Sequence, residues 1–387
     1  MRRVDTLVVG GGPAGAAAAC ELALRDCDTI LVERSGGPHH KVCGEFLSVE
    51  TLTYLRRLGV DAMTLGAVPV ETVSICTDDR VASASLPFHA LSLSRYVLDG
   101  ALLQRAADLG VSVQRGVLVR RVERIGRGWI ATCDDGAIIG CNHLVLATGK
   151  VGLRGIEDTR DGSMVGLKMH LSAAADLRHE LAGRVELFLF GRGYAGLELV
   201  EGGNANLCCL VERDVARSVG TDWNRLRTFL AIANDRLGMR LSRAEPMWDR
   251  VLAVTCPQGG HLNRDGGGRL YRVGDRAAHI PPFTGDGLAI ALGTGTLAAT
   301  CIAEDRGAAD YAEAARRLGR RPVRLAGLVS RLMARPAVRR MMIGAASRIP
   351  ALTATAVRGT RLPGHRHGGV SRKRSTWWPE GCLPSHR

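Results

Sequence analysis

The sequence predicts an α/β protein, in which a doubly wound, Rossmann-like domain carries an inserted antiparallel sheet and a C-terminal helical segment. Three observations support this fold class. A glycine-rich turn joins an apolar run to a small-residue helix at 6–19, alternating apolar and polar residues fill much of 165–211, and an apolar run returns at 270–275. Because a parallel sheet with an insertion produces such an interrupted pattern, we expect the first domain to be assembled from three segments.

The glycine-rich turn predicts a dinucleotide site. Gly10 ends the apolar run, Gly12 leaves bare backbone for a phosphate, and Gly15 allows the next helix to pack closely. The free amides at the start of that helix carry partial positive charge, which suits a pyrophosphate. Glu33 ends the second strand 18 residues after Gly15, where its carboxylate can accept bonds from a ribose diol.

The same glycine spacing occurs a second time, at Gly191, Gly193 and Gly196. It also follows an apolar run, but the residues after it, 197–200, are typical of a strand rather than of a small-residue helix. No second strand ending in an acid follows at the required distance. We therefore predict that this copy belongs to the antiparallel sheet and binds no nucleotide.

The first domain is expected to comprise residues 1–66, 94–164 and 256–310. Ser48 and Ser94 are typical helix N-caps, and Gly59 and Gly110 mark the ends of the helices that follow them. The expected elements are a strand–helix–strand unit at 4–33, helices at 49–58 and 95–109, and strands at 111–113, 117–122, 144–149 and 270–275.

The second domain is expected to comprise residues 67–93 and 165–255. A hairpin at 68–86 turns at Asp78 and Asp79, and further strands are expected at 165–171, 185–190, 196–200, 205–211 and 250–255, with a helix at 223–237. Beyond Asp310, helices are expected through residue 358, interrupted by Pro322, Pro336 and Pro350. Residues 359–387 are rich in Gly, Pro, Arg and Ser, which predicts a disordered basic tail.

The charge is distributed unevenly along the chain. Residues 1–311 contain 35 Lys and Arg against 36 Asp and Glu, whereas residues 312–387 contain 17 against 2. The neutral main body argues against a nucleic-acid partner. The 11 cysteines include no CxxC pair and no leader precedes the first strand, so we expect a reducing, cytoplasmic setting. The longest weakly polar run, 287–303, is too short and too polar for a membrane span.

A second informative stretch begins at Gly274 and Asp275, where the returning strand delivers a carboxylate. A turn containing Pro281 and Pro282 follows, and Gly285 and Gly287 open a long small-residue helix. Together with the first glycine turn, this stretch resembles the aromatic-hydroxylase and geranylgeranyl-reductase group of flavoproteins. The loop 41–45 and the pair Ser94–Arg95 are similar to motifs of the same group, so the resemblance covers roughly residues 4–305.

The resemblance implies that the dinucleotide is FAD. Asp275 would bond the ribityl hydroxyls, Arg95 would reach the cofactor, and the helix opening at Gly285 would direct its amides at the reducible end of the flavin, where they favour the negative charge left by reduction. The expected cofactor-binding residues are Gly10, Gly12, Pro13, Ala14, Gly15, Glu33, Arg34, Cys43, Gly44, Arg95, Val119, Thr148, Gly149, Gly274, Asp275, Pro282, Gly285, Gly287 and Leu288.

Cys43, Tyr194 and His279 are the candidate catalytic residues. Cys43 lies near Lys41, which would favour a reactive thiolate, although a lone cysteine commonly just packs. Tyr194 either lines the substrate pocket or is an ordinary sheet tyrosine. His170, His261 and His279 are candidate proton donors, of which His279 lies beside the proline turn, but a lone histidine is more often structural. His39, His40 and Cys43 give no complete ligand set, so no metal is predicted.

The sequence also departs from the patterns of the group. Hydroxylases usually have Ala-Asp-Gly where this chain has Ala147-Thr148-Gly149, which weakens the expectation of direct NADPH docking. Prenyl-reducing relatives carry a Tyr, Trp, Phe, Pro motif, of which only Tyr194 is present, so a geranylgeranyl diphosphate is less expected as the substrate. Ala278 replaces a glycine expected after Gly274-Asp275.

The leading hypothesis is an FAD-dependent reductase that moves a hydride through flavin N5 to or from an apolar small molecule, such as an isoprenoid, a polyketide or an aromatic compound. One alternative is an FAD-dependent monooxygenase that hydroxylates with O2, and another is a flavin-binding electron-transfer or scaffold protein. Electrons would come from NAD(P)H or a protein partner. The basic segment 316–358 either approaches anionic lipid, which would place the enzyme at the membrane periphery, or covers a domain with solvated arginines.

Overall fold

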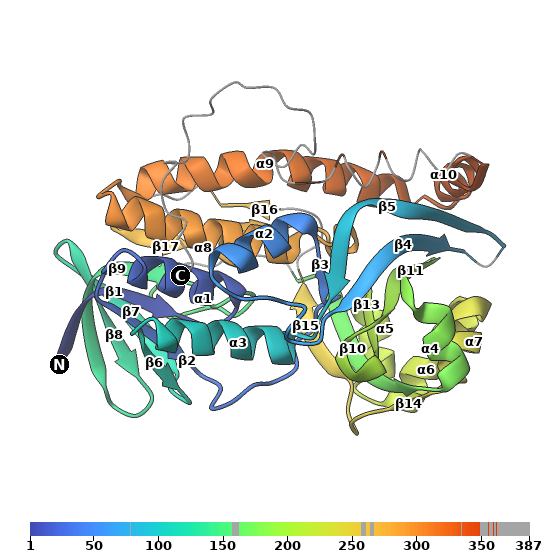
Figure 1. Ribbon diagram of the computed structural model, residues 1–387, viewed down its shortest axis with the longest axis horizontal. Helices are drawn as coiled ribbons and strands as arrows, with labels where there is room; N and C mark the ends of the chain where they lie inside the picture. The colour runs from blue at the N-terminus through green and yellow to red at the C-terminus, as the bar shows by residue number, and fades with distance from the viewer. Residues whose placement is uncertain are drawn as a thin grey trace, which may run out of the picture.

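The protein is described by a computed structural model, which covers residues 1–77, 79–156, 162–256, 261–263, 267–333 and 335–348, together with residues 355, 359 and 361. Two sheets lie side by side, and the long helix α9 (Ala308–Met333) leads from the first sheet toward α10 (Pro336–Arg348), which packs near the second (Figure 1). The predicted disordered tail lies outside the described residues, except for residues 359 and 361.

The first sheet has the strand order β6-β2-β1-β9-β8-β7, with β17 beside β9. Five of these strands run parallel, and Val9, Val32, Leu146 and Arg272 stand in neighbouring register positions at their carboxyl ends. Loops that follow the strands therefore gather at one edge. The strands are β1 (Arg2–Val9), β2 (Thr29–Glu33), β6 (Ser112–Arg115), β7 (Val119–Ile125), β8 (Gly128–Cys133), β9 (Ile138–Leu146) and β17 (Leu270–Arg272).

The two faces of the first sheet are covered differently. Val8, Leu31 and Val145 pack against helices, whereas Leu7 and Val9 face the side closed by the β7–β8–β9 meander. Two of these helices, α1 (Pro13–Ala23) and α8 (Gly287–Ala303), are very close together: a Cβ added to Gly295 would lie 2.2 Å from the carbonyl oxygen of Ala14. This contact explains why small residues stand where the two helices meet. The helices on this face are α1 (Pro13–Ala23), α3 (Arg95–Asp108), α8 (Gly287–Ala303) and, beside α8, α2 (Val49–Arg57).

The second sheet has the order β14-β10-β13-β12-β11-β4-β5-β3, with β15 also beside β10, and is antiparallel except between β11 and β4. Its strands are β3 (Phe46–Leu47), β4 (Val68–Cys76), β5 (Val81–Ser92), β10 (Met164–Ala173), β11 (Gly183–Phe190), β12 (Gly193–Leu199), β13 (Ala205–Glu212), β14 (Ala244–Pro246) and β15 (Leu252–Cys256). The predicted α/β fold with an antiparallel second sheet is thus confirmed; the domain boundaries stay predictions.

Side chains alternate between the two faces of the second sheet. Leu167, Met169 and Leu207 belong to a fully apolar core with four short helices. Lys168, His170 and Asn206 point to the opposite face, where they meet the loop that joins β2 to β3. The short helices are α4 (Ala175–Leu181), α5 (Arg213–Val219), α6 (Trp223–Ala233) and α7 (Asp235–Leu241).

Two predictions about helices are wrong. The helix expected at 223–237 ends at Ala233, because Asn234 is extended (φ −158°) and its side chain accepts a bond from the amide of Leu237 to begin α7. Pro322 does not interrupt the C-terminal helix but lies buried inside α9. A proline there removes one backbone hydrogen bond, while the buried stripe of α9 packs against α8 and the first sheet, and this packing maintains the helix.

The second glycine pattern lies in the antiparallel sheet, as predicted, where it begins in the turn between β11 and β12; that it binds no nucleotide stays a prediction. Gly193 has φ +156°, and a Cβ there would lie 2.1 Å from the carbonyl oxygen of Leu210. Glycine is therefore required for the approach of two strands. Among the described helices, none combines the length and the apolar character needed to cross a bilayer.

Candidate FAD site and substrate face

The first glycine turn forms a close backbone contact. The amide of Gly10 donates to the carbonyl of Val32 (2.8 Å), and its φ of +107° suits glycine. A Cβ on Gly10 would lie 2.5 Å from the carbonyl oxygen of Ala147, and one on Gly15 would lie 1.9 Å from that of Gly10. Side chains are thus excluded where β1, α1 and β9 meet.

Gly12 differs from its neighbours, because a Cβ there would meet a single atom, Arg95 Nη2 at 3.6 Å. Gly12 also precedes Pro13 as the N-cap of α1, and none of the described side chains caps this helix. The open space and the uncapped amides fit a pyrophosphate that approaches the backbone.

Glu33 is buried at the end of β2. Its carboxylate accepts bonds from the amides of Gly11 (2.6 Å) and Ser35 (3.0 Å). Burial would raise the pKa of Glu33, but the Gly11 amide, Lys41 and Ser35 lower the pKa below its ordinary value. The group is therefore an anion at neutral pH, as recognition of a ribose diol requires. Arg34, next in the chain, is exposed.

Asp275 follows β17 at the same edge of the sheet. Lys150 Nζ lies 2.9 Å from Asp275 Oδ2, and His279 Nδ1 lies 3.6 Å from Oδ1. Burial would raise the pKa of Asp275, but Lys150 and His279 hold it well below its ordinary value. Asp275 is thus an ionised acceptor, suited to the ribityl hydroxyls.

Thr148 stands where related hydroxylases have an acid, and it is held by a cation. Arg276 Nε donates to Thr148 Oγ1 (2.9 Å), and Thr148 Oγ1 donates to the carbonyl of Val151 (2.8 Å). No local pattern predicted roles for Arg276 and Lys150, because their partners come from distant segments.

The two glycines of the turn before α8 have different surroundings. Gly285 has φ +73°, and a Cβ there would lie 2.7 Å from Phe46 Cδ1. Gly287, the first residue of α8, is exposed, and a Cβ there would meet no protein atom within 4 Å. Asp286 is fully buried, and burial raises its pKa to about 7. Arg361 Nη1, which lies 2.7 Å from Asp286 Oδ1, opposes this rise.

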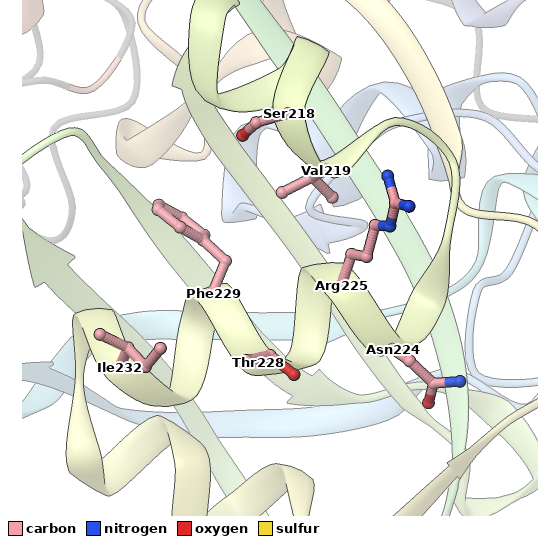
Figure 2. A pocket seen from close by; sticks show the side chains of 7 residues that line it. All are labelled: Ser218, Val219, Asn224, Arg225, Thr228, Phe229 and Ile232. Atoms are coloured by element: carbon pink, nitrogen blue, oxygen red, sulfur yellow. The ribbon is translucent and has the colours of Figure 1, made fainter.

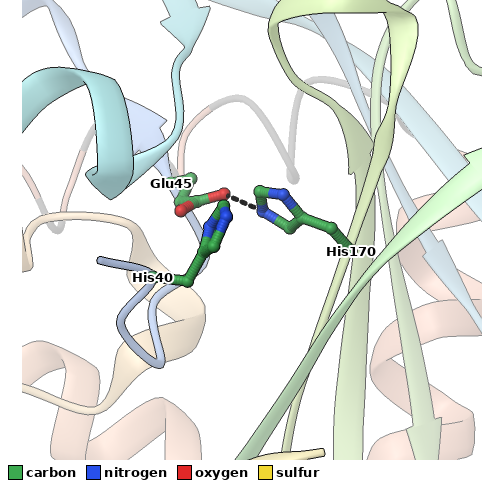
Figure 3. A group of neighbouring side chains, drawn as sticks. All are labelled: His40, Glu45 and His170. Carbon is green, nitrogen blue, oxygen red and sulfur yellow. Dashed lines mark hydrogen bonds and ion pairs between the residues drawn. The ribbon is translucent and has the colours of Figure 1, made fainter. Parts of the chain in front are cut away.

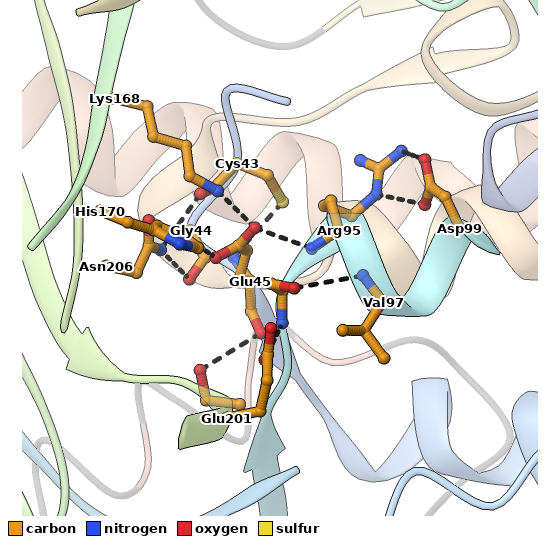
Figure 4. A network of polar contacts seen from close by, with 12 residues as sticks. Cys43, Gly44, Glu45, Arg95, Val97, Asp99, Lys168, His170, Glu201 and Asn206 are labelled. Atoms are coloured by element: carbon orange, nitrogen blue, oxygen red, sulfur yellow. Dashed lines mark hydrogen bonds and ion pairs between the residues drawn. The ribbon is translucent and has the colours of Figure 1, made fainter. Parts of the chain in front are cut away.

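The predicted partner of Cys43 is engaged elsewhere. Lys41 pairs with Asp99 (3.0 Å), and Arg95 makes a bidentate pair with the same carboxylate (2.6 and 2.8 Å). Cys43 Sγ accepts a bond from the amide of Glu45 (3.3 Å) and is partly exposed. Figure 4 shows Cys43 between the Arg95–Asp99 pair and the second sheet.

Glu45, a residue to which the sequence assigned no role, is the centre of a buried polar cluster. It adopts φ +63°, which is unusual for glutamate, and its carboxylate accepts bonds from Lys168 Nζ, from the Arg95 amide (2.7 Å) and from His170 Nε2 (2.7 Å). Burial would raise the pKa of Glu45, but Lys168 and then His170 lower it. Figures 3 and 4 show the cluster where the first sheet's loop meets β10.

Tyr194 lies on the same face of the second sheet, in its apolar part. Its ring meets Phe283 of the turn before α8 edge to face, with centroids 6.1 Å apart. A Cβ on Gly196, two residues along β12, would be in ordinary contact with Leu187 Cδ2 at 3.5 Å, and Val42 of the loop packs over Gly166. This face therefore offers an apolar surface next to the predicted flavin position.

A separate hollow is remote from this region. It lies between α5 and α6 on the outer side of the second sheet, where Phe229, Ile232 and Arg225 are among its lining residues (Figure 2). Because none of its lining residues belongs to either glycine turn or to the Glu45 cluster, we do not assign the chemistry to it.

The structure brings most of the predicted cofactor residues to one edge of the first sheet. Val119 is buried in the core on the meander side of the sheet, and the nearby Val117 amide donates to the carbonyl of Glu33 (3.2 Å). The side chain of His261 is outside the described residues. The glycine turns, Glu33, Arg95, Thr148, Gly149, Gly274, Asp275 and the turn 282–288 form a site that fits FAD, with an open backbone for the pyrophosphate and carboxylates for the sugar hydroxyls.

Comparisons with known proteins agree with this geometry. Residues 3–150 match the family model described as an FAD binding domain. The chain is 27% identical over 344 residues to menaquinone reductase of Mycolicibacterium smegmatis, covering 81% of this chain and 79% of that protein. It is 26% identical over 340 residues to digeranylgeranylglycerophospholipid reductase 2 of Methanosphaera stadtmanae, covering 81% of each. A geranylgeranyl bacteriochlorophyll reductase-like structure from Thermoplasma acidophilum has the same fold, with a TM-score of 0.75 at 19% identity, covering 93% of this chain and 96% of that one.

The fold and the glycine cradle therefore define a flavoprotein that binds FAD. The resemblance to the geranylgeranyl-reductase-like and aromatic-hydroxylase-like flavoproteins is confirmed, and the protein is an FAD-dependent oxidoreductase.

Proposed function

We propose that the protein is a reductase that transfers a hydride from FAD to an apolar small molecule of the quinone or isoprenoid type. The observation that carries the proposal is the face of the second sheet around Tyr194, which is apolar and abuts the turn before α8. Two relatives, a menaquinone reductase and a digeranylgeranylglycerophospholipid reductase, support the substrate class.

In this proposal the chain's own residues hold the cofactor and exclude water, while FAD supplies the redox chemistry. Gly12 and the α1 amides hold the pyrophosphate, Glu33 and Asp275 hold sugar hydroxyls, and the α8 N-terminus favours negative charge on the reduced ring. Tyr194 and Phe283 orient the substrate through their apolar surfaces.

Anaerobic turnover tests the proposal. The holoenzyme, reduced with dithionite and mixed with menadione without oxygen, is expected to reoxidise its flavin and form the hydroquinone. Reoxidation that proceeds only in air, with incorporation of oxygen into an organic substrate, would instead establish the monooxygenase alternative.

We further propose NAD(P)H as the electron donor. Arg276 donates to Thr148, and Lys150, two residues further along the chain, pairs with Asp275, so the position that carries an acid in related hydroxylases contacts a cation here and is compatible with an anionic dinucleotide. Mixing the oxidised holoenzyme anaerobically with NADH or NADPH should bleach the flavin absorbance. If neither nucleotide does so, a protein donor replaces this assignment.

The C-terminal helices support a location at the membrane periphery. Leu328 and Met341 are 47% and 68% exposed. The same segment of the chain carries the exposed arginines Arg316, Arg317, Arg320, Arg321, Arg324, Arg331, Arg335, Arg340 and Arg348. Such a surface suits anionic lipid. The full chain should sediment with phosphatidylglycerol vesicles at low salt and not with phosphatidylcholine vesicles, and Leu328→Asp should weaken sedimentation. Equal recovery with both lipids would contradict this location.

A further inference from the structure

The face of the second sheet that carries Lys168, His170 and Asn206 changes from polar to apolar along its strands. Lys168 and His170 of β10 stand beside Cys208 and Asn206 of β13, and the last of these pairs with Glu198 of β12. Gly166 lies two residues from Lys168 and four from His170 along β10. It pairs with Leu210, which pairs with Tyr194, and these positions begin the apolar part of the face. The face thus joins a buried polar cluster to the apolar surface assigned to the substrate.

The cluster is tied to the flavin site through one short loop. Glu45 accepts a bond from the Arg95 amide, and the Arg95 side chain approaches Gly12 in the pyrophosphate cradle. Asn206 Nδ2 donates to the carbonyls of Cys43 and Gly44 (3.3 and 3.0 Å), and Phe46 contacts the turn at Gly285. The loop 43–46 therefore lies between the cofactor cradle and the polar row.

His170 also has a route to the surface. Its ring lies edge-on to that of His40, with centroids 4.7 Å apart, and Trp248 covers both rings. His40 in turn stacks on Tyr96 (5.0 Å), which is 43% exposed. His40 Nδ1 is buried and has no hydrogen-bond partner among the described residues. Burial, and then the charges of His170 and Lys168, lower the pKa of His40 to about 4, so it is neutral at pH 7 and would hold a proton only in passing.

A metal ion is a weaker interpretation of the same residues. Ligand atoms of His40, Glu45 and His170 lie within 4.8 Å of one another. However, the ammonium of Lys168 is bonded to the same carboxylate and would repel a cation. The cluster has the composition of a proton-transfer site, in which a carboxylate holds a histidine in a fixed orientation.

We propose that His170 donates the proton that must accompany hydride transfer to the substrate, that Glu45 is its positioning residue, and that His40 returns the proton from solvent. The inference rests on the proposed reductase function and assigns a residue to it. With Nε2 bonded to Glu45, Nδ1 is the nitrogen that releases the proton.

The chemistry balances for a quinone. The substrate receives two electrons and one proton as a hydride from the reduced cofactor, and the hydroquinone requires one more proton. The Nδ1–H bond of the imidazolium breaks, an O–H bond forms on the substrate, and the electron pair stays on His170. A solvent proton then restores the imidazolium through His40.

Several charged groups surround His170. Its Nε2 lies 2.7 Å from Glu45, whose carboxylate also accepts a bond from Lys168. Glu198 is buried, and burial followed by repulsion from Glu45 raises its pKa well above the ordinary value. Glu201 lies nearby and accepts a bond from the Ser94 amide (2.8 Å).

The test is anaerobic stopped-flow mixing of dithionite-reduced holoenzyme with menadione, following flavin absorbance and a pH indicator together. In the wild type, proton uptake from the medium should lag behind flavin oxidation, because the first proton comes from His170. In His170→Asn, oxidation should slow by about 100-fold, the lag should disappear, and added imidazole should restore part of the rate. FAD affinity, measured by fluorescence, should stay within about twofold of the wild type, because His170 does not hold the cofactor.

His143→Asn is the matched control, because His143 is also a buried histidine but belongs to β9, beside Tyr271 (ring centroids 5.8 Å apart). It should preserve both rate and lag. Absence of a lag in the wild type, an unchanged rate in His170→Asn, or a Glu198→Gln variant that alone reproduces the loss would overturn the assignment to His170. If the wild type does not reduce menadione at all, the reductase proposal itself fails, which separates the two failures.

Discussion

The chain contains the Gly-x-Gly-x-x-Gly pattern twice, and the two copies have different surroundings. Gly10–Gly15 lies between a parallel strand and a helix, and a Cβ on its middle glycine would meet only Arg95 Nη2, at 3.6 Å. Gly191–Gly196 lies in an antiparallel hairpin, and its middle glycine presses against Leu210. The pattern alone therefore reports a close backbone approach, and only the elements around it show whether the approaching group is a phosphate or another strand.

The largest effect is expected at Gly10, the first glycine of the first copy. Gly10→Ala should cost about 3 kcal/mol of FAD binding, or roughly 100-fold in affinity, because alanine is strained at φ +107° and its Cβ would meet the carbonyl of Ala147 at 2.5 Å. Fluorescence titration of the apoprotein with FAD measures the loss. Affinity within a factor of two of the wild type would show that the turn can relax, and would break the comparison.

The middle glycine of the second copy should give the reverse result. Gly193→Ala should lower the free energy of unfolding by about 2–3 kcal/mol, because its Cβ would lie 2.1 Å from the carbonyl of Leu210. Urea unfolding measures this loss, while the FAD affinity of the folded fraction should be unchanged. A selective loss of FAD affinity would instead make the second copy a nucleotide site.

Glu33 is the acid that follows the first copy and has no equivalent after the second copy. Glu33→Gln should weaken FAD binding by about 1.5 kcal/mol, or roughly tenfold, because a neutral amide is a poorer acceptor than a carboxylate. The pKa of Glu33 in the folded protein is below its ordinary value. The contribution of its carboxylate to FAD binding is therefore complete above the ordinary pKa and is lost as the pH falls through the lowered pKa. FAD retention measured between pH 3 and pH 7 should fall at the acid end in the wild type, and less steeply in the variant. Parallel curves would remove Glu33 from the site.

Local patterns were sufficient to predict most of the fold. Ser48 and Ser94 cap their helices as expected, accepting bonds from the amides of Thr51 and Val97. The errors arose where tertiary contacts override a local rule, as at Pro322, or where one polar residue acts as both a stop and a cap, as at Asn234. No local pattern distinguishes those cases.

The candidate site could be predicted only in part. Glycines and acids at strand ends are visible in the sequence, because their spacing is local. Glu45 and Lys168 are 123 positions apart, and neither has a local signal for its partner. Lys168 occupies a strand position where an apolar residue would be the ordinary expectation, and alternation with Leu167 and Met169 marks its face. A buried charge on an otherwise apolar strand was the signal that could have located the cluster.

The smallest expected effect, from Gly191→Ala, makes the comparison most direct, because Gly191 occupies the position in the second copy that Gly10 occupies in the first. Gly191 is exposed, has no unusual φ, and a Cβ there would meet no atom within 4 Å. The substitution should change the free energy of unfolding by less than about 0.5 kcal/mol, and FAD affinity should not change. Measured beside Gly10→Ala in the same titration and urea series, it makes the same replacement at equivalent places in identical spacings. A large effect at Gly191 would show that the spacing itself, and not the strand–turn–helix around it, imposes the requirement for glycine.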